Sequence, residues 1–391
     1  MTTALTLHIA RQPADINPAA WDALLACQAQ PTPFMQHAFL AALHASGSAV
    51  PETGWAPCFA LLRQGSELVA ACPLYVKNHS WGEYVFDWAW ARAYGDHGLP
   101  YYPKAVVAVP FSPVPGSRLL ARDAPTRAAL AQALVQWSQA QQLSSLHVLF
   151  GDDADQAACA QAGLMARNQV QFHWHNAHPG DGRGFDSFEA FLASLNQEKR
   201  KKIRQERRRV AEAGVRFRWL RGADIRAQDW AFFYRCHERT YLEHGHHPYL
   251  APAFFAHMAR DMAAHWVLFM AEREGHPLAC SLIAVDDNSP QPVAWGRYWG
   301  ALERVDCLHF EACYYQPIEW CIAHGITGFE GGAQGEHKMA RALMPARTHS
   351  AHWLAHPAFA SAVEDFLARE DKGVQGYLAH LQARSPFRQA S

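Results

Sequence analysis

The sequence predicts a mixed α+β protein made of two copies of one domain, joined by a strongly basic helix. Three observations support this prediction: the length, an internal repeat, and a run of Lys and Arg between the two halves. A chain of 391 residues, 50% of them hydrophobic, can form two cores, since single cores stop growing at roughly 250–300 residues. We expect a first domain at 1–180, a linker and basic helix at 181–214, and a second domain at 215–391.

The repeat consists of three matches in the same order along each half. Each half first has two apolar runs around a turn that contains Gly65 or Gly275, which predicts a β-hairpin. A helix-spaced apolar segment and a short strand follow, at 126–150 and at 309–332. The third match aligns LMARNQVQFHW with LMPARTHSAHW, with Leu-Met and His-Trp at equal spacing. This order predicts tandem domains, each a mixed, mostly antiparallel sheet flanked by helices, with a longer insertion around Tyr94–Pro115 in the first.

Composition limits the choice of partner and compartment. With 35 Lys and Arg against 36 Asp and Glu, attraction to an anion must come from a local patch. The first residues lack a basic segment followed by an apolar one, and no stretch approaches the roughly 18 apolar residues of a membrane span. We therefore expect a cytoplasmic protein without a transmembrane segment. Nine cysteines without a C-x-x-C pair favour reduced thiols over disulfides or a zinc ribbon.

The basic helix is the first candidate site. Ser187 can cap a helix that we expect to run to about Gly214, and Glu206 is the single acid among the bases of residues 199–209. Clustered Lys and Arg attract phosphate oxygens. A solvated helix face that only spaces the domains is the alternative. The residues that we expect to bind a phosphate of the donor or acceptor are Lys199, Arg200, Lys202, Arg204, Arg207 and Arg208.

The second candidate is the Gly-rich end of the strand near 328, in the sequence ITGFEGGAQGEHKMARALMP. Gly331 and Gly332 permit close backbone approach, so that backbone N–H groups could bind a phosphate or an oxyanion. Lys338 and Arg341 are candidate phosphate partners here. Candidate bases are Glu330, Glu336 and His337. The alternative is a glycine turn that closes a sheet edge.

The third candidate joins a strand at Arg297 and Tyr298 to a helix that bears His309 and Glu311. Amide-forming transfer needs a base for the proton of the amine, and either of the last two side chains could serve. For each alone a structural role is the alternative. Acceptor binding is predicted for Arg297 and Tyr298 and for an aromatic run of the first half. We expect this run to form a loop-rich wall of a binding site. The alternative is an insertion that only packs against the domain. The residues of that run are Asp87, Trp88, Tyr94, Tyr101, Tyr102 and Lys104.

No metal site is expected. His173 and His175 would share one face of a strand, and His244, His246 and His247 lie close in sequence. A distinct third ligand group and an H-E-x-x-H motif are both absent from the sequence. There is also no G-x-S-x-G elbow for a serine nucleophile.

Several of these segments together resemble the FemAB-like group of N-acyltransferases within the GNAT superfamily. They are PLYVKNHSWGEYVFDWAWARAY, YYPKAVVAVPFSPVPGSRLL, RKKIRQERRRVAEAG, FFYRCHERTYLEHGHHPYL, RYWG, LHFEACYYQPIEWCIAHG and FEGGAQGEHKMARAL. The resemblance implies two tandem acetyltransferase-type domains, no tightly bound cofactor, and acyl-CoA or aminoacyl-tRNA as the donor. It also implies an amine acceptor, which could be an anionic or lipid-linked cell-wall precursor.

Two features of related enzymes are missing from the sequence. The Q/R-x-x-G-x-G/A loop of CoA-using acetyltransferases follows neither central strand, and residues 215–391 leave no room for a long helical tRNA arm. Both donors therefore stay open. The alternative function is a non-catalytic binding protein for a phosphorylated or nucleic-acid ligand on the same fold. Oligomeric state is not predicted.

Overall fold

The computed structural model describes residues 4–332 and 335–388. The chain forms two compact units whose residues interleave in sequence. Unit 1 contains Met1–Gln169, Tyr249–Phe254 and Arg347–Tyr377, and unit 2 contains Val170–Pro248, Phe255–Ala346 and Leu378–Ser391. Each unit therefore takes a pairing strand from the other half of the sequence, while the domain boundaries expected at 180 and 215 stay a prediction.

Unit 2 is built on one mixed sheet in the order β10-β11-β12-β13-β14-β9. The strands β10 (Val215–Arg221), β11 (Trp266–Arg273), β12 (His276–Asp286) and β13 (Val293–Ala301) pair antiparallel. Next, β14 (Gly328–Glu330) runs parallel to β13, and β9 (Met165–His175) closes the sheet antiparallel to β14. The parallel pair requires a crossover, which contains the helix α11 (Gln316–Ala323).

Unit 1 follows the same order but splits its sheet in two. One sheet contains β1 (Leu5–Ala10), β3 (Phe59–Gln64), β4 (Glu67–Cys72) and β7 (Leu120–Ala121). The other contains β2 (Trp55–Pro57), β5 (Leu74–Lys77), β6 (Lys104–Val107), β8 (Ser145–Gly151) and β15 (Met344–Leu354). Pro73 separates β4 from β5, because proline donates no ladder hydrogen bond. The corresponding strand of unit 2, β12, is continuous.

The duplicated α+β fold is thus confirmed. In both units a hairpin precedes an antiparallel strand, a parallel strand follows after a helix, and an antiparallel strand closes the sheet. The matching segments that begin at Leu164 and Leu343 become the two closing strands, β9 and β15. The turns at Gly65 and Gly275 both have positive φ, the backbone region that favours glycine.

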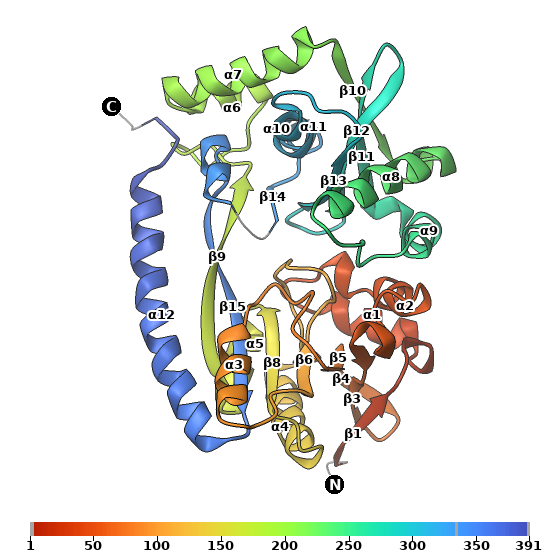
Figure 1. Ribbon diagram of the computed structural model, residues 1–391, viewed down its shortest axis with the longest axis vertical. Coiled ribbons are helices and arrows are strands. Elements are labelled where there is room, and N and C mark those ends of the chain that lie inside the picture. The colour runs from red at the N-terminus through yellow and green to blue at the C-terminus, as the bar shows by residue number, and fades with distance from the viewer. Residues whose placement is uncertain (1–3, 333–334, 389–391) are drawn as a thin grey trace. The chain divides into compact units, whose positions relative to one another are not determined.

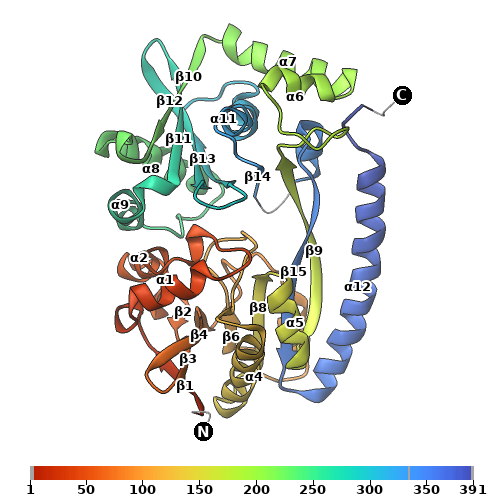
Figure 2. The same ribbon diagram turned by 180° about the vertical axis from the view of Figure 1, so that it is seen from behind.

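Helices cover both faces of the second sheet of unit 1. Figure 2 shows α4 (Ala124–Ala140) and α5 (Asp153–Gln161) on one face, over the apolar core of Ala105, Val107 and Leu146. Figure 1 shows α3 (Trp88–Asp96) on the other. The aromatic run of the first half is therefore not all loop, because its residues 88–96 form this helix. The remaining helices of 7 residues or more are α1 (Pro18–Ala26), α2 (His37–Ala45), α6 (Phe188–Ser194), α7 (Gln197–Glu212), α8 (Ala227–Glu243), α9 (Pro252–Asp261) and α12 (Pro357–Ala383).

The predicted single basic helix is two helices. Ser187 caps α6 by accepting a hydrogen bond from the backbone N–H of Ala190, as expected. Helix α6 ends at Ser194, because Leu195 is extended and forms a β-bridge with Phe387. Asn196 then caps α7 by accepting from the N–H of Lys199. The partner strand comes from the far C-terminus, so no local signal could have located the break.

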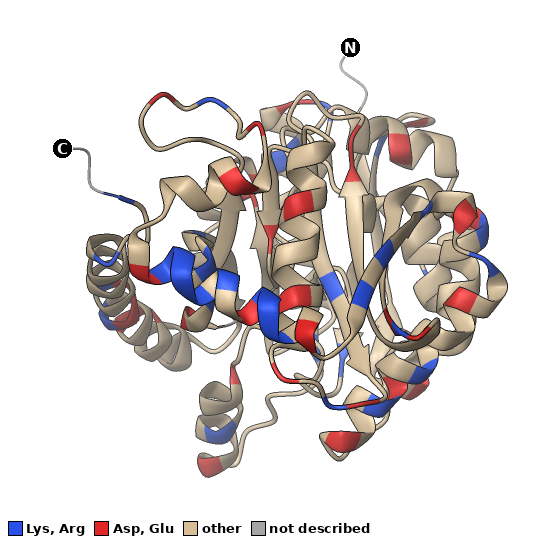
Figure 3. Ribbon diagram, turned by 90° about the horizontal axis from the view of Figure 1, so that it is seen from above, with Lys and Arg blue, Asp and Glu red and all other residues tan. Residues whose placement is uncertain are grey.

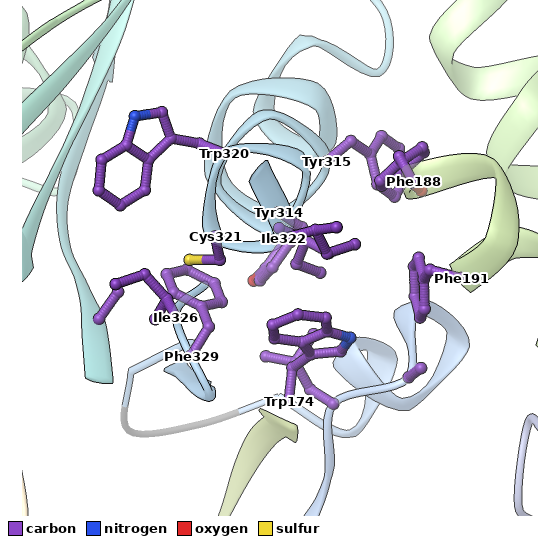
Figure 4. Close-up of a cluster of buried hydrophobic side chains, with 14 of the residues drawn as sticks. Trp174, Phe188, Phe191, Tyr314, Tyr315, Trp320, Cys321, Ile322, Ile326 and Phe329 are labelled. Atoms are coloured by element: carbon purple, nitrogen blue, oxygen red, sulfur yellow. The ribbon is translucent and has the colours of Figure 1, made fainter. Parts of the chain in front are cut away.

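The core of unit 2 lies between its sheet and the helices α6, α7 and α11. Figure 4 shows Trp174 and Phe329 from the sheet in contact with Phe191 and Cys321 from the helices. Ile203 is the residue of α7 that reaches this core. Val210 of α7 packs in a second apolar cluster with Val215 and Leu278, and ion pairs add to these two contacts.

Gly300 marks the closest approach of a helix to this sheet. A Cβ at this position would lie 2.1 Å from the carbonyl oxygen of Cys236 in α8. We expect Gly300→Ala to lower the free energy of unfolding by about 1–3 kcal/mol or more, because helix and strand must move apart. Gly373→Ala in α12 is the matched control: it meets open space and should be stabilising by about 0.5–1 kcal/mol. Denaturant unfolding measures both, and equal stability of the two variants would contradict the close approach.

Candidate functional site

A pocket of about 170 Å³ opens in unit 2 where the pairing of β13 with β14 ends. The parallel ladder stops at Trp295 and Glu330. Immediately afterwards Arg297 is an extra residue in β13, because Gly296 pairs with Ile283 and Tyr298 with Leu282. Bulges of this kind re-aim side chains beside binding sites. Gly296, Arg297 and Tyr298 line one wall of the pocket, and Gly331 and Gly332 line another.

A short π-helical turn supplies the third wall. The helix α10 (Leu308–Phe310) continues into η6 (Glu311–Tyr315), which has π-helical geometry. His309, Cys313 and Tyr314 from this segment line the pocket. Such turns rotate successive side chains away from the usual helical face and often occur at functional sites. Here Tyr315 consequently points into the core beside Glu206 instead.

His309 is the titratable side chain of this lining that is best placed to accept a proton. Its ring lies 5.4 Å from the ring of Trp299 and 5.7 Å from that of Tyr314, with its remaining surface exposed. Desolvation by this packing, together with the electrostatic influence of His337, Arg341 and Lys338, lowers the pKa of His309 to about 4. The imidazole is therefore neutral around pH 7, and one ring nitrogen has a free lone pair.

Lys338 lies behind the Gly331–Gly332 wall, in the 3-10 turn η7 (Glu336–Arg341). Its side chain is buried, and Nζ donates a hydrogen bond of 2.9 Å to the carbonyl oxygen of Gly332. Burial lowers the pKa of Lys338 to about 8. A Cβ at Gly331 would lie 2.5 Å from Leu343 and 3.4 Å from the Lys338 side chain. Glycine is thus required at position 331 by the close packing of this wall.

The other candidate bases have partners of their own. The carboxylate of Glu330 lies 3.9 Å from Nε2 of His173, and Glu336 forms an ion pair with Arg384. Nε2 of His337 lies 3.4 Å from the hydroxyl of Tyr314, at the limit of a hydrogen bond.

Glu311 is buried and accepts a hydrogen bond of 3.1 Å from Arg207 in α7. Burial raises the pKa of Glu311, although the positive charge of Arg207 opposes the shift. Arg341 is buried as well and binds both carboxylate oxygens of Glu206, at 3.1 and 2.9 Å, while Tyr315 donates to the same carboxylate. These contacts anchor α7, so Arg207 and Arg341 hold the helix in place.

Figure 3 shows the Lys and Arg positions that follow one another along α7. These bases differ in whether they form an ion pair. Lys199, Arg204 and Arg208 form ion pairs with Glu198, Glu189 and Glu212. Among the residues that the structure describes, no such pair is formed by Arg200, Lys201, Lys202 and Arg209. Lys201 and Lys202 are exposed and adjacent. The local excess of positive charge is therefore smaller than the sequence suggests, and it centres on these two lysines.

Unit 1 places three of the predicted acceptor residues, Asp87, Tyr101 and Lys104, in a buried polar cluster. Lys104 donates hydrogen bonds to Ser80 (2.8 Å) and Glu83 (2.9 Å) and also to Asp87. Asp87 further accepts a hydrogen bond of 2.6 Å from the hydroxyl of Tyr101. All five side chains are buried. The ammonium group of Lys104 thus joins β6 to the segment between β5 and α3.

A histidine pair extends this cluster across the sheet. Nε2 of His147 in β8 lies 2.8 Å from the hydroxyl of Ser145 and 3.3 Å from that of Tyr101. Nδ1 of His147 lies 2.7 Å from Nδ1 of His352 in β15, so one ring donates to the other. Burial first, then the positive charge of Lys104, lowers the pKa of His147 to about 3. Both rings are therefore neutral in the folded protein at pH 7.

The pKa values of the ionisable groups in this cluster are strongly shifted. Burial lowers the pKa of Lys77 to about 7, while Glu83, 3.9 Å away, favours its charged form. Burial likewise raises the pKa of Glu83 to about 7. Burial would also raise the pKa of Asp87, but the Lys104 ammonium outweighs it and lowers that pKa. Lys104 and Asp87 are therefore the permanently charged members at neutral pH.

The cluster lies beneath exposed aromatic side chains. Trp81 and Trp88 are 59% and 37% exposed, and their ring centroids are 5.1 Å apart. Tyr94 is buried against Phe359, and Tyr102 is half-buried, with its hydroxyl 2.9 Å from that of Ser80. Of the predicted acceptor residues of this run, Trp88 is thus the one whose ring is openly accessible.

In unit 1 the parallel ladder ends where Val107 of β6 pairs with Val148 of β8. The buried guanidinium of Arg118 occupies that position. It donates to the carbonyl oxygen of Leu149 in β8 (3.1 Å), and also to those of Gly116 (3.2 Å) and Val114 in the segment that follows β6. The duplication thus leaves the wedge open in unit 2 and filled in unit 1.

The structure adds residues that the sequence did not single out. Ser281, Trp299 and Cys313 belong to the pocket of unit 2. Lys77, Glu83, His147 and His352 belong to the buried cluster of unit 1. For His147 the sequence signal was a histidine inside a mostly apolar strand, SLHVLFG.

Among residues 4–332 and 335–388, no three His, Cys, Asp or Glu side chains are arranged to hold a metal ion. No helix of this part of the chain is long and apolar enough to cross a membrane.

Comparison with solved structures defines the class of fold. FemX matches with a TM-score of 0.54 at 9% identity, over 89% of this chain and 98% of that one. L-PGS from Bacillus licheniformis matches with 0.54 at 10%, over 92% and 99%. A conserved protein of unknown function from Bacteroides thetaiotaomicron VPI-5482 matches with 0.52 at 9%, over 89% and 99%. At these identities the likeness shows the fold alone, which is the fold shared with FemX and L-PGS.

The sequence narrows this class to a family. The model of the FemAB-like family, described as peptidoglycan biosynthesis/recognition, matches residues 12–389. The chain therefore belongs to the FemAB-like family. Among curated proteins no significant sequence match is found.

Proposed function

We propose that the protein is an N-acyltransferase that moves an acyl or aminoacyl group from an activated donor to an amine acceptor in the pocket of unit 2. One observation carries this proposal: the open wedge beyond Trp295 and Glu330, lined by a neutral histidine and two glycines. Its volume suits the reacting acyl group, while the bulk of the donor would lie outside.

The reaction requires three functions of the site: it must position the amine, accept its proton and stabilise the oxyanion. The amine attacks the carbonyl carbon of the donor ester or thioester, and a C–N bond forms as the carbonyl oxygen becomes an oxyanion. A base must take the ammonium proton, which we assign to His309, because it lines the pocket and is neutral. Collapse of the oxyanion then breaks the bond to the donor oxygen or sulfur, which leaves with a proton.

The oxyanion would lie within the positive field of the Gly331–Gly332 wall. Lys338 is buried directly behind that wall, and Arg341 is buried nearby. A fixed ammonium in a water-poor site stabilises developing negative charge more strongly than it would in water. Lys338 also keeps the glycine turn in place through the carbonyl of Gly332. We assign it electrostatic and positioning roles.

The donor is an acyl-CoA or an aminoacyl-tRNA, whose phosphates Arg200, Lys201, Lys202 and Arg209 would bind. The acceptor is an amine of a cell-wall precursor, as membership of a family associated with peptidoglycan biosynthesis and recognition suggests. The phosphates of such a precursor, or of a lipid-linked form, are the alternative ligand of the same lysines. The protein would work on the cytoplasmic side of the membrane.

The donor can be identified by thermal stabilisation with a panel of acyl-CoAs, charged tRNAs and soluble cell-wall precursors. A ligand at about 100 times its dissociation constant stabilises by about 2.7 kcal/mol, which is readily measured. We expect one donor class to stabilise the protein. For tRNA, Lys201→Gln/Lys202→Gln should weaken binding and flatten its salt dependence by about one unit of slope per lost phosphate contact.

The matched control is Arg369→Gln/Lys372→Gln on α12, which removes the same charge from exposed positions of unit 1. This variant should bind as the unmodified protein does. No stabilisation by any member of the panel would contradict the transferase proposal. Stabilisation without acyl transfer would instead support the alternative, a non-catalytic protein that binds a phosphorylated or nucleic-acid ligand.

A further inference from the structure

Unit 1 contains a second pocket, of about 380 Å³, which the acyl-transfer proposal does not use. It lies at the end of the sheet where β8 begins and β15 ends, held together by the hydrogen bond from the N–H of Ala355 to the carbonyl of Ser144 (2.9 Å). The turn after α4 and the segment between α3 and β6 complete its walls. The volume is within the range of about 300–1,000 Å³ that small-molecule sites occupy.

The lining contains no Asp, Glu, Lys or Arg, and its one imidazole belongs to the exposed His356. Apolar surface comes from the half-buried ring of Trp353 and from Leu99 and Leu143. Side-chain amides of Gln139 and Gln142 are exposed at its edge, each with two N–H donors and one acceptor oxygen. A phosphate or carboxylate ligand would lose water here without gaining a cation, so the lining disfavours anions.

Tyr94 gives an independent indication that a polar ligand is missing. The residue lines the pocket and is 3% exposed. Its hydroxyl is buried and has no hydrogen-bond partner among the described residues. A buried hydroxyl without a partner costs about 1–3 kcal/mol, and a ligand oxygen or N–H would remove that cost. Gln142 at the edge adopts φ 54°, an uncommon conformation for a residue other than glycine, and such outliers often occur at ligand sites.

We propose that this pocket binds an uncharged, polyhydroxylated ring, such as a neutral or N-acetylated hexose unit. The C–H face of such a ring can pack on the indole of Trp353, an apolar surface with a polar neighbourhood. Its hydroxyl or acetamido groups can bond with Gln139, Gln142 and the hydroxyl of Tyr94. The proposal rests on unit 1 alone and does not depend on acyl transfer in unit 2.

The test is saturation-transfer NMR on the full chain with three related probes. N-acetylglucosamine is neutral, glucosamine is cationic and glucuronate is anionic, with rings of similar size. We expect a saturation-transfer signal from N-acetylglucosamine at millimolar concentration and at least tenfold weaker binding of glucuronate. Equal binding of all three, or none of the neutral sugar, would overturn the proposal.

Variants locate the site. Tyr94→Phe removes one hydroxyl without changing the packing, and Gln142→Gly removes the amide while keeping a residue that tolerates positive φ. Each should weaken binding of N-acetylglucosamine about tenfold, whereas the neighbouring exposed Gln141→Ala should not. Undiminished binding in both pocket variants would overturn the assignment. Loss of the signal in His309→Ala would place the sugar in unit 2 and likewise overturn it.

Discussion

Lys104→Met is expected to cost roughly 3–5 kcal/mol of the free energy of unfolding at pH 7, because removing one partner of a buried ion pair leaves the other charge uncompensated. Lys104 is completely buried and is the shared donor to Ser80, Glu83 and Asp87. Without it, the Asp87 carboxylate stays in an environment that water does not reach. Chemical denaturation measures the loss directly.

Two further variants distinguish charge from packing. Lys104→Met/Glu83→Gln/Asp87→Asn removes the charges together and should regain much of the lost stability, because an uncharged replacement of a buried ion cluster is often neutral. Arg204→Met breaks the exposed pair with Glu189, and should cost at most about 1 kcal/mol. If the single and triple variants of the cluster are equally unstable, the loss reflects packing and the electrostatic explanation is wrong.

His309→Ala is expected to lower the rate of acyl transfer about 10²- to 10⁴-fold, the usual contribution of a general base. The donor would be the one found by thermal stabilisation. His276→Ala, at an exposed hairpin turn, is the control and should keep full activity. An unchanged rate in a folded His309→Ala protein would remove this residue from the mechanism.

The pH profile gives a second readout of the same assignment. The imidazole must be neutral to accept a proton, and its pKa is lowered from the usual value of 6.5 to about 4. The rate should therefore be level through pH 6.5 and fall as the pH drops through about 4. A rate that falls as the pH drops through about 8 would instead indicate that neutral Lys338, whose pKa is about 8, is the base.

Much of the fold follows from local sequence patterns. The apolar runs around Gly65 and Gly275 each specify a hairpin, and the helix-spaced runs specify α4 and α11. The equal spacing of Leu-Met and His-Trp identified β9 and β15 as equivalent strands. Each of these signals lies within one element, so that neighbouring residues alone decide it.

The candidate site was predictable only in part. Gly331, Gly332, Arg297, Tyr298 and His309 do line one pocket. The sequence also treated the bases of α7 as a single anion site, although Arg207 binds Glu311 and Arg204 binds Glu189. These acids lie 15 or more residues away in sequence, where a count of local charges does not find them. The roles of all these residues in catalysis or binding stay predictions.

The sequence by itself thus determined the element types, the duplication and the family, because these depend on periodicity and motif within short segments. The tertiary structure decided which strand closes each unit, which of the two wedges is open, and which charges are buried together. Arg118 fills one wedge and Lys104 joins a cluster inside the same unit, yet neither is distinguishable in the sequence from a surface base. Burial and pairing depend on residues brought together by the whole chain, and therefore only the folded structure specifies them.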